Sequence, residues 1–227
     1  METLNLQKGD LLNLSKNYSK LNNIDLGLGW DVSTGGRPWD LDVSAIALND
    51  NGELVEAVYY GNLNGTGIKL NGDNLTGIGD GDDEIITVNL NSIPSNVKII
   101  GFFVNIFSAN GRDFSKVKNA YIRMVDKDRN EEVCKYKLNE SGKGYDAFHF
   151  ANLERVNNEW RFKTIGEGTN GGVFALNKYF QQKVNQQKIT QPKVINNSSK
   201  ETITEAPQTI TNNTKKGFFA KLFSRWF

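Results

Sequence analysis

The stretch DLDVSAIALNDNGELVEAVYY, residues 40–60, decides the fold class. In residues 40–48 apolar side chains occupy every odd position from 41 to 47, which is the two-residue period of a β-strand. The turn at residues 49–52 contains Asn, Asp and Gly, which tolerate positive φ. Residues 54–60 are therefore predicted to return as the second strand of an antiparallel hairpin.

The rest of the first 170 residues follows the same pattern. Residues 97–107, VKIIGFFVNIF, are apolar for most of their length, which predicts a central strand with both faces covered. The first convincing helix comes late, at residues 172–182. Many short strands without helices between them predict an all-β, antiparallel β-sandwich. The other predicted strands are residues 84–90, 119–126, 131–138, 145–156 and 159–165.

The composition excludes several classes of protein. The chain has 227 residues, and its 38% hydrophobic content is that of a soluble globular protein. A single cysteine, Cys134, excludes a disulfide framework, and a single histidine, His149, excludes a multi-histidine zinc site. No apolar run approaches the roughly 20 residues that a membrane-spanning helix needs, and no secretory signal is visible. A cytoplasmic location is the expectation.

The charge is unevenly distributed along the chain. Residues 176–227 carry nine basic and two acidic side chains, whereas residues 1–175 carry 18 basic and 24 acidic ones. Residues 184–214 are rich in Asn, Gln, Thr and Ser and lack aromatics, which predicts a flexible linker. We expect a sandwich over residues 1–175, a short helix and linker over residues 176–214, and a cationic amphipathic helix over residues 215–227.

The segment GDNLTGIGDGDDE, residues 72–84, gathers acidic side chains between glycines. Carboxylate and carbonyl oxygens on a flexible loop, without nitrogen or sulfur ligands, suit Ca²⁺ better than Mg²⁺. The spacing does not match an EF-hand. A solvated acidic surface loop is the alternative, and composition alone does not decide between the two.

A second acidic cluster lies earlier in the chain. Asp31 closes one predicted strand, and Asp40 and Asp42 open the next. Positions i and i+2 of a strand point to the same side, so Asp40 and Asp42 can present two carboxylates to one ion. A polar strand end explains this pair equally well.

The motifs LGLGWD (residues 26–31), DLDVSA (residues 40–45) and GDNLTGIGDGDDE (residues 72–84) resemble those of the TerD-type tellurium-resistance and calcium-binding stress proteins of bacteria. The similarity covers roughly residues 1–175. It implies a β-sandwich that binds Ca²⁺ through its loops, a role in stress and tellurium resistance, and complexes with other stress-response proteins. The implied candidate ligands are Asp31, Asp40, Asp42, Asp73, Asn74, Asp80, Asp82, Asp83 and Glu84.

The C-terminal segment GFFAKLFSRWF, residues 217–227, has the pattern of an amphipathic helix. At about 100° per residue its aromatic side chains cover one half of the circumference and its cations lie on the other. An anionic membrane surface, a groove on a partner protein and the sandwich itself are three possible coverings for the apolar half. The first would place the protein at the inner face of the membrane. The candidate contact residues are Phe218, Phe219, Lys221, Leu222, Phe223, Arg225, Trp226 and Phe227.

Catalysis finds little support in the sequence. His149 lies in an aromatic strand, where we expect a hydrogen-bonded core residue, and Cys134 lies in mid-strand, where we expect an inert buried thiol. Phosphate-loop and nucleophile-elbow motifs are absent, and an acidic body with few tail cations argues against nucleic acid. We expect no enzymatic activity. The rival interpretations are a metal-independent interaction scaffold and a metal-assisted hydrolase.

Overall fold

The computed structural model describes residues 3–18, 20–32, 40–71, 81–138 and 142–190. In chain order the elements are β1 (Leu4–Leu6), β2 (Leu11–Asn13), α1 (Leu14–Asn17), β3 (Asn23–Val32), β4 (Leu41–Asn49), β5 (Leu54–Val58), β6 (Ile68–Leu70), β7 (Glu84–Asn89), β8 (Val97–Ile106), η1 (Phe114–Lys116), β9 (Val117–Asp126), β10 (Glu131–Lys137), β11 (Ala147–Val156), β12 (Glu159–Thr169) and α2 (Val173–Thr190).

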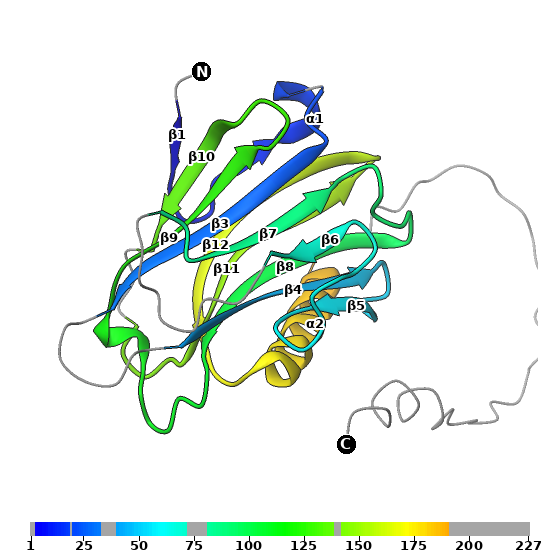
Figure 1. Cartoon of the computed structure of the whole chain (residues 1–227). Helices are drawn as coiled ribbons and strands as arrows, with labels where there is room; N and C mark the ends of the chain where they lie inside the picture. Colours follow the sequence, from blue (N-terminus) through cyan, green and yellow to red (C-terminus); the bar gives the residue numbers. More distant parts are fainter. Residues whose placement is uncertain (1–2, 19, 33–39, 72–80, 139–141, 191–227) are drawn as a thin grey trace, which may run out of the picture. The chain divides into compact units, whose positions relative to one another are not determined.

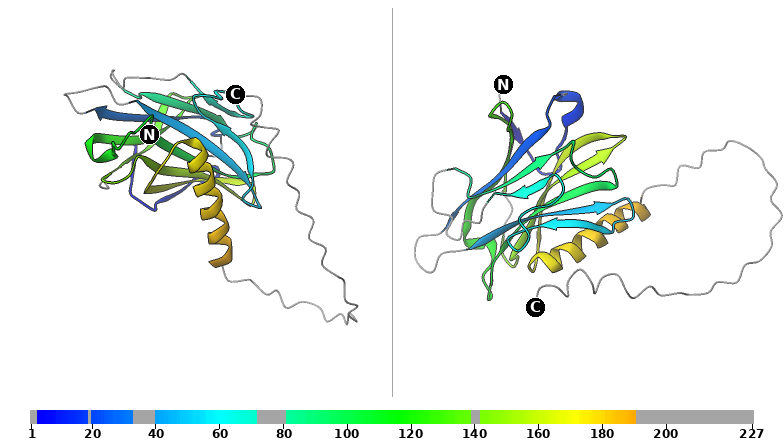
Figure 2. Two further views of the ribbon diagram at one scale, coloured as in Figure 1. Left: turned by 90° about the horizontal axis from the view of Figure 1, so that it is seen from below. Right: turned by 45° about the vertical axis from the view of Figure 1, so that its right-hand side comes forward.

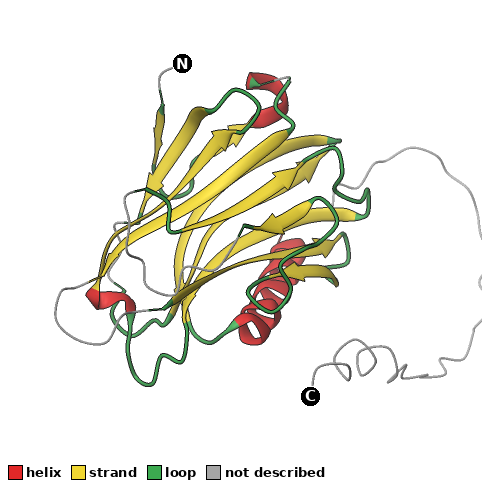
Figure 3. Ribbon diagram, viewed as in Figure 1, coloured by secondary structure: helices red, strands yellow, loops and turns green. Residues whose placement is uncertain are grey.

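The strands form two sheets that pack face to face (Figures 1 and 3). The β3 sheet has the order β1-β10-β9-β3-β7-β6, and the β8 sheet has the order β2-β12-β11-β8-β4-β5. Neighbouring strands are antiparallel except β1, which runs parallel to β10. The predicted antiparallel β-sandwich is confirmed.

The hairpin of β4 and β5 positions the core as its pattern predicts. The odd residues of β4, such as Leu41 and Val43, are buried between the sheets, whereas Ile46 and Leu48 are buried on the opposite face. Strand β8 lies between β4 and β11 and contributes to both apolar clusters, so the prediction of a central strand is confirmed.

Helix α2 covers part of the outer face of the β8 sheet (Figure 2). Its Leu176 and Phe180, one turn apart, pack against Ile46 and Phe103. The helix continues to Thr190, so the prediction of a linker from residue 184 is wrong for residues 184–190. The extension is stabilised because Val184 packs against the same cluster and Lys183 pairs with Glu167. None of the described helices is long and apolar enough to cross a bilayer.

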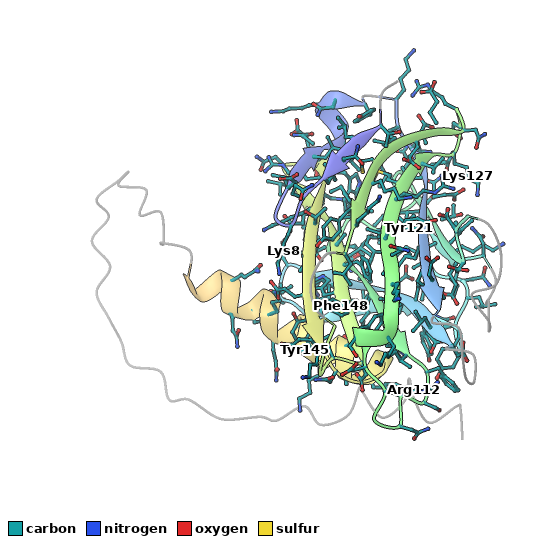
Figure 4. All side chains as sticks on the ribbon, turned by 90° about the vertical axis from the view of Figure 1, so that its left-hand side faces the viewer. Lys8, Arg112, Tyr121, Lys127, Tyr145 and Phe148 are labelled. Carbon is teal, nitrogen blue, oxygen red and sulfur yellow. The ribbon has the colours of Figure 1, made fainter. Side chains whose placement is uncertain are left out.

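The sandwich has two ends, which we name by the residues that lie there. We call the end where β3 finishes and β4 and β7 begin the acidic end. We call the opposite end, where β7 and β11 finish, the arginine end, after Arg155. Figure 4 shows Arg112 and Tyr145 at the acidic end, Lys127 at the arginine end and Tyr121 between them.

Candidate functional site

Three consecutive acidic residues, Asp82, Asp83 and Glu84, lead into β7 at the acidic end. Each of their carboxylates contacts a different strand. Together these contacts fix the entry to β7 against both sheets.

The carboxylate of Asp82 forms an ion pair on the outer face of the β3 sheet. The Arg123 Nε donates to Asp82 Oδ1 at 2.8 Å and to Oδ2 at 3.0 Å, and the Tyr121 hydroxyl donates to Oδ1 at 3.0 Å. The Asp82 side chain is only 6% exposed. It sits over Gly27, where a β-carbon would approach Oδ2 to 1.9 Å, so only glycine leaves room for it.

The carboxylate of Asp83 lies among other negative charges. Its Oδ2 accepts a hydrogen bond from the backbone N–H of Trp30 at 2.9 Å. Burial raises the pKa of Asp83; the Trp30 bond lowers it in part, and the charges of Asp82 and Asp31 raise it further. The ionised form of Asp83 is therefore disfavoured, and a bound cation would stabilise it.

Glu84 connects the two sheets. Its side chain is buried, and its Oε2 accepts the backbone N–H of Val43 in β4 at 2.9 Å. The bond is possible because β4 extends beyond its partner β5 here, where the paired residues begin at Ala45. A buried carboxylate held this way fixes β7 to β4.

Asp40 and Asp42 lie at the start of β4, as the sequence predicts. Asp42 shares its side of the strand with Ile46 and is 5% exposed, and its Oδ2 accepts from the Asn105 amide at 3.3 Å. Asp40 is half-buried just before the strand. Both acids therefore lie where β4 of the β8 sheet begins, at the acidic end.

Asp31 ends β3 and is exposed. The side-chain amide of Asn119, at the start of β9, donates to Asp31 Oδ2 at 2.5 Å. Asp31 raises the pKa of Asp83, which places the two carboxylates in the same electrostatic neighbourhood.

Asp31 and Asp82 thus lie near enough to Asp83 to raise its pKa, whereas Asp40 and Asp42 lie on the neighbouring sheet. Among the described residues, no three acidic, histidine or cysteine side chains form a group that could hold a metal ion. The predicted ligands Asp73, Asn74 and Asp80 lie outside the described residues. The available donors are all oxygens, which fits Ca²⁺ in type.

Two residues of this site, Tyr121 and Arg123, were not predicted from the sequence. The register of β3 with β9 places Gly27 opposite Arg123 and Gly29 opposite Tyr121. A β-carbon on Gly29 would approach the Tyr121 ring to 2.5 Å. The alternating glycines of LGLGWD are the signal that could have indicated a strand covered by neighbouring side chains.

The two groups considered for catalysis are buried. His149 stacks on Phe103 with ring centroids 4.3 Å apart and contacts the Asn152 amide oxygen at 2.6 Å. Burial lowers the pKa of His149 to about 3, and burial raises the pKa of the Cys134 thiol to about 12. The predictions of a hydrogen-bonded core histidine and a buried thiol are confirmed.

The predicted contact residues of the C-terminal tail cannot be placed in the same way, because residues 215–227 lie outside the described residues.

Comparisons with known proteins agree with these observations. A family model described as "TerD domain" matches residues 2–180. The tellurium resistance protein TerD of Serratia marcescens is 40% identical over 182 residues, covering 77% of this chain and 95% of its own. General stress protein 16U of Bacillus subtilis (strain 168) is 38% identical over 180 residues, covering 75% of this chain and 93% of its own.

A solved structure supports the fold. The crystal structure of a homologue of telluride resistance protein (TerD) from Streptomyces coelicolor A3(2) has a TM-score of 0.58 at 20% identity and covers 69% of this chain and 95% of its own. By its match to the family model and its similarity to these relatives, the chain belongs to the TerD family of tellurium-resistance and general stress proteins.

Proposed function

We propose that this protein is a non-catalytic, calcium-binding stress protein whose acidic end holds the ion. The observation that carries the proposal is the position of the Asp83 carboxylate, which is partly buried beside Asp82 and Asp31. Such a cluster repels itself when ionised, and a divalent cation relieves the repulsion. The candidate ligands at this end would offer oxygen atoms, which is the ligand type that Ca²⁺ prefers.

The contacts divide the candidate residues into two roles. Asp82 is an anchor because it pairs with Arg123, and Glu84 is one because its side chain is buried, only 3% exposed, against the Val43 N–H. The ligands are then drawn from the remaining candidates, which are Asp31, Asp40, Asp42, Asp73, Asn74, Asp80 and Asp83. When bound, calcium would supply positive charge and order to this end, creating a surface that recruits another molecule.

Isothermal titration of the chelator-treated full chain with CaCl₂ tests the proposal. We expect saturable heat with CaCl₂, and weaker binding of MgCl₂ because Mg²⁺ gives up its waters reluctantly. The double substitution Asp31→Asn/Asp83→Asn should weaken calcium binding at least about tenfold. Asp50→Asn/Asp128→Asn, in turns at the opposite end, removes the same charge and should leave binding unchanged. Absence of calcium heat would favour the metal-independent scaffold.

The non-catalytic part of the proposal has its own test. The burial of His149 and Cys134 supports it, as do the relatives' names, which state no catalytic activity. A screen of phosphoesters with Ca²⁺, Mg²⁺ and Mn²⁺ should give no turnover above background. Turnover that is lost in Asp31→Asn/Asp83→Asn would instead indicate a metal-assisted hydrolase.

For the tail, the proposal is attachment to an anionic membrane surface. The support is the sequence pattern, in which six apolar side chains share one half of a helix and Lys221 and Arg225 lie on the other. Deletion of residues 215–227 should abolish sedimentation with phosphatidylserine-containing liposomes. Unchanged sedimentation would contradict it, and sedimentation that requires added cell extract would point to a protein partner, such as another stress-response protein.

A further inference from the structure

A surface cavity of about 360 Å³ opens at the arginine end, and none of the described candidate calcium ligands lines it. Buried leucine and isoleucine side chains form its base, and α1, the segment after β7 and the turn between β11 and β12 form its walls. The volume is within the range of small-molecule sites. All of the residues that line it are described.

Arg155 is held rigidly at the wall of this cavity. Its Nη1 donates to the carbonyl of Pro94 at 2.9 Å and its Nη2 to the carbonyl of Ile93 at 3.0 Å. The guanidinium lies over the Trp160 ring, 4.4 Å from the centroid. These bonds use two of the five N–H donors of an arginine, so the others remain for a ligand.

Arg155 has no ion-pair partner in the part of the chain that the structure describes, and the lining of the cavity contains no acidic side chain. Burial lowers the pKa of Arg155, and no opposite charge offsets the effect. An anionic group in the cavity would stabilise the guanidinium.

The other polar groups of the wall can donate hydrogen bonds. The Ser15 hydroxyl accepts a hydrogen bond from the backbone N–H of Trp160 at 2.9 Å. The hydroxyl proton of Ser15 therefore remains able to donate. Burial raises the pKa of Tyr18, so its phenol keeps its proton. Asn91 and Asn158 add side-chain amides. A ligand that accepts several hydrogen bonds matches this lining.

We infer that this cavity binds a small organic carboxylate, with its head group beside Arg155 and a short apolar body between Tyr18 and the leucine base. The carboxylate accepts bidentate hydrogen bonds from a guanidinium. The cavity is larger than an inorganic ion needs; most of its exposed lining is polar, and the leucine base leaves room for only a short apolar body. The inference uses none of the residues of the proposed calcium site.

Benzoate is the probe for this site. In ¹⁵N NMR spectra of the full chain, titration with benzoate should shift the Arg155 Nε and the Ser15 and Asn158 amide signals saturably. The neutral isostere benzamide should bind at least about tenfold more weakly, because it lacks the charge that complements Arg155. Shifts that fail to saturate by about 20 mM would overturn the inference.

Substitutions test whether Arg155 binds the carboxylate of benzoate. Arg155→Gln should weaken benzoate binding at least about tenfold, whereas Arg129→Gln, which removes a cation from the β9–β10 turn at the same end, should not. If Arg155→Gln unfolds, Ser15→Ala and Tyr18→Phe should each weaken binding. Equal affinity for benzamide, or phosphate that competes as well as benzoate, would contradict a site for organic carboxylates.

Discussion

The two ends of the sandwich present different charged groups on the same scaffold. At the acidic end, Arg123 pairs with Asp82, but Asp83 remains beside other carboxylates. At the arginine end, Arg155 lines a cavity whose lining contains no acidic side chain. The ten residues of β3, at about 3.3 Å each, separate the ends by about 30 Å. The comparison teaches that the proposed calcium site and the proposed carboxylate site use separate residues of one β-sandwich, so each can be tested without disturbing the other.

The largest expected effect concerns His149, which lies under α2 and belongs to neither end. Its pKa falls to about 3 in the folded state from an ordinary value near 6.5, so protonation favours unfolding. Stability is full above pH 6.5 and should fall by about 1.4 kcal/mol per pH unit below it, until pH reaches about 3.

Urea denaturation of wild type and His149→Gln between pH 7 and pH 4 measures this slope. The variant should lack it, which leaves carboxylates with a lowered pKa, such as Asp113 and Glu167, as the remaining source of acid sensitivity. Parallel pH profiles would show that His149 does not contribute.

Asp82→Ala should destabilise the acidic end without removing the proposed calcium site. The expected loss is about 1–3 kcal/mol, less than for a fully buried pair because Arg123 is 31% exposed. Urea denaturation of Asp82→Ala, Arg123→Ala and the variant with both substitutions gives the coupling energy between Asp82 and Arg123. Unchanged stability together with loss of calcium heat would make Asp82 a ligand rather than an anchor.

Glu84→Ala tests the link between the sheets at the acidic end. Without the carboxylate, the Val43 N–H loses its acceptor, and we expect a loss of about 1–2 kcal/mol. Glu84→Gln keeps an acceptor oxygen and serves as the control, with a smaller loss in the same denaturation series. Equal losses would mean that the charge of Glu84, rather than this hydrogen bond, stabilises the fold.

Asp83→Asn should have the smallest effect on stability. Because the pKa of Asp83 is raised, its ionised form costs stability at neutral pH, and the neutral amide should slightly raise the melting temperature in chelator. The same variant should reduce the calcium response and leave benzoate binding at the arginine end unchanged. A change in benzoate affinity would show that the two ends are coupled.

Much of the fold is encoded in local patterns, whereas the contacts of the site are not. The alternation in residues 40–48 predicts the inner face of β4, although not the burial of its other face under α2, and the apolar run of residues 97–107 predicts the central place of β8. The three-residue strands β1, β2 and β6 are too short for any periodicity to show. Helix α2 extends past the prediction because tertiary packing of Val184 outweighs the polar composition around it.

The contacts of the candidate site also could not be predicted from local sequence patterns. The acidic residues 82–84 stand out in the sequence, but their roles depend on the register that places Arg123 opposite Gly27. No local pattern specifies that register. The cavity at the arginine end likewise joins α1 to residues 91–93 and 155–160, which are distant in sequence.

The most direct test of the central claim is the melting temperature of the full chain, stripped with chelator and measured with and without CaCl₂. At 100 times the dissociation constant, calcium should stabilise the folded state by about 2.7 kcal/mol. For a domain of this size that corresponds to a rise of about 5–10 °C, which Asp31→Asn/Asp83→Asn should largely remove. Identical melting curves with chelator and with saturating calcium would contradict a calcium site at the acidic end.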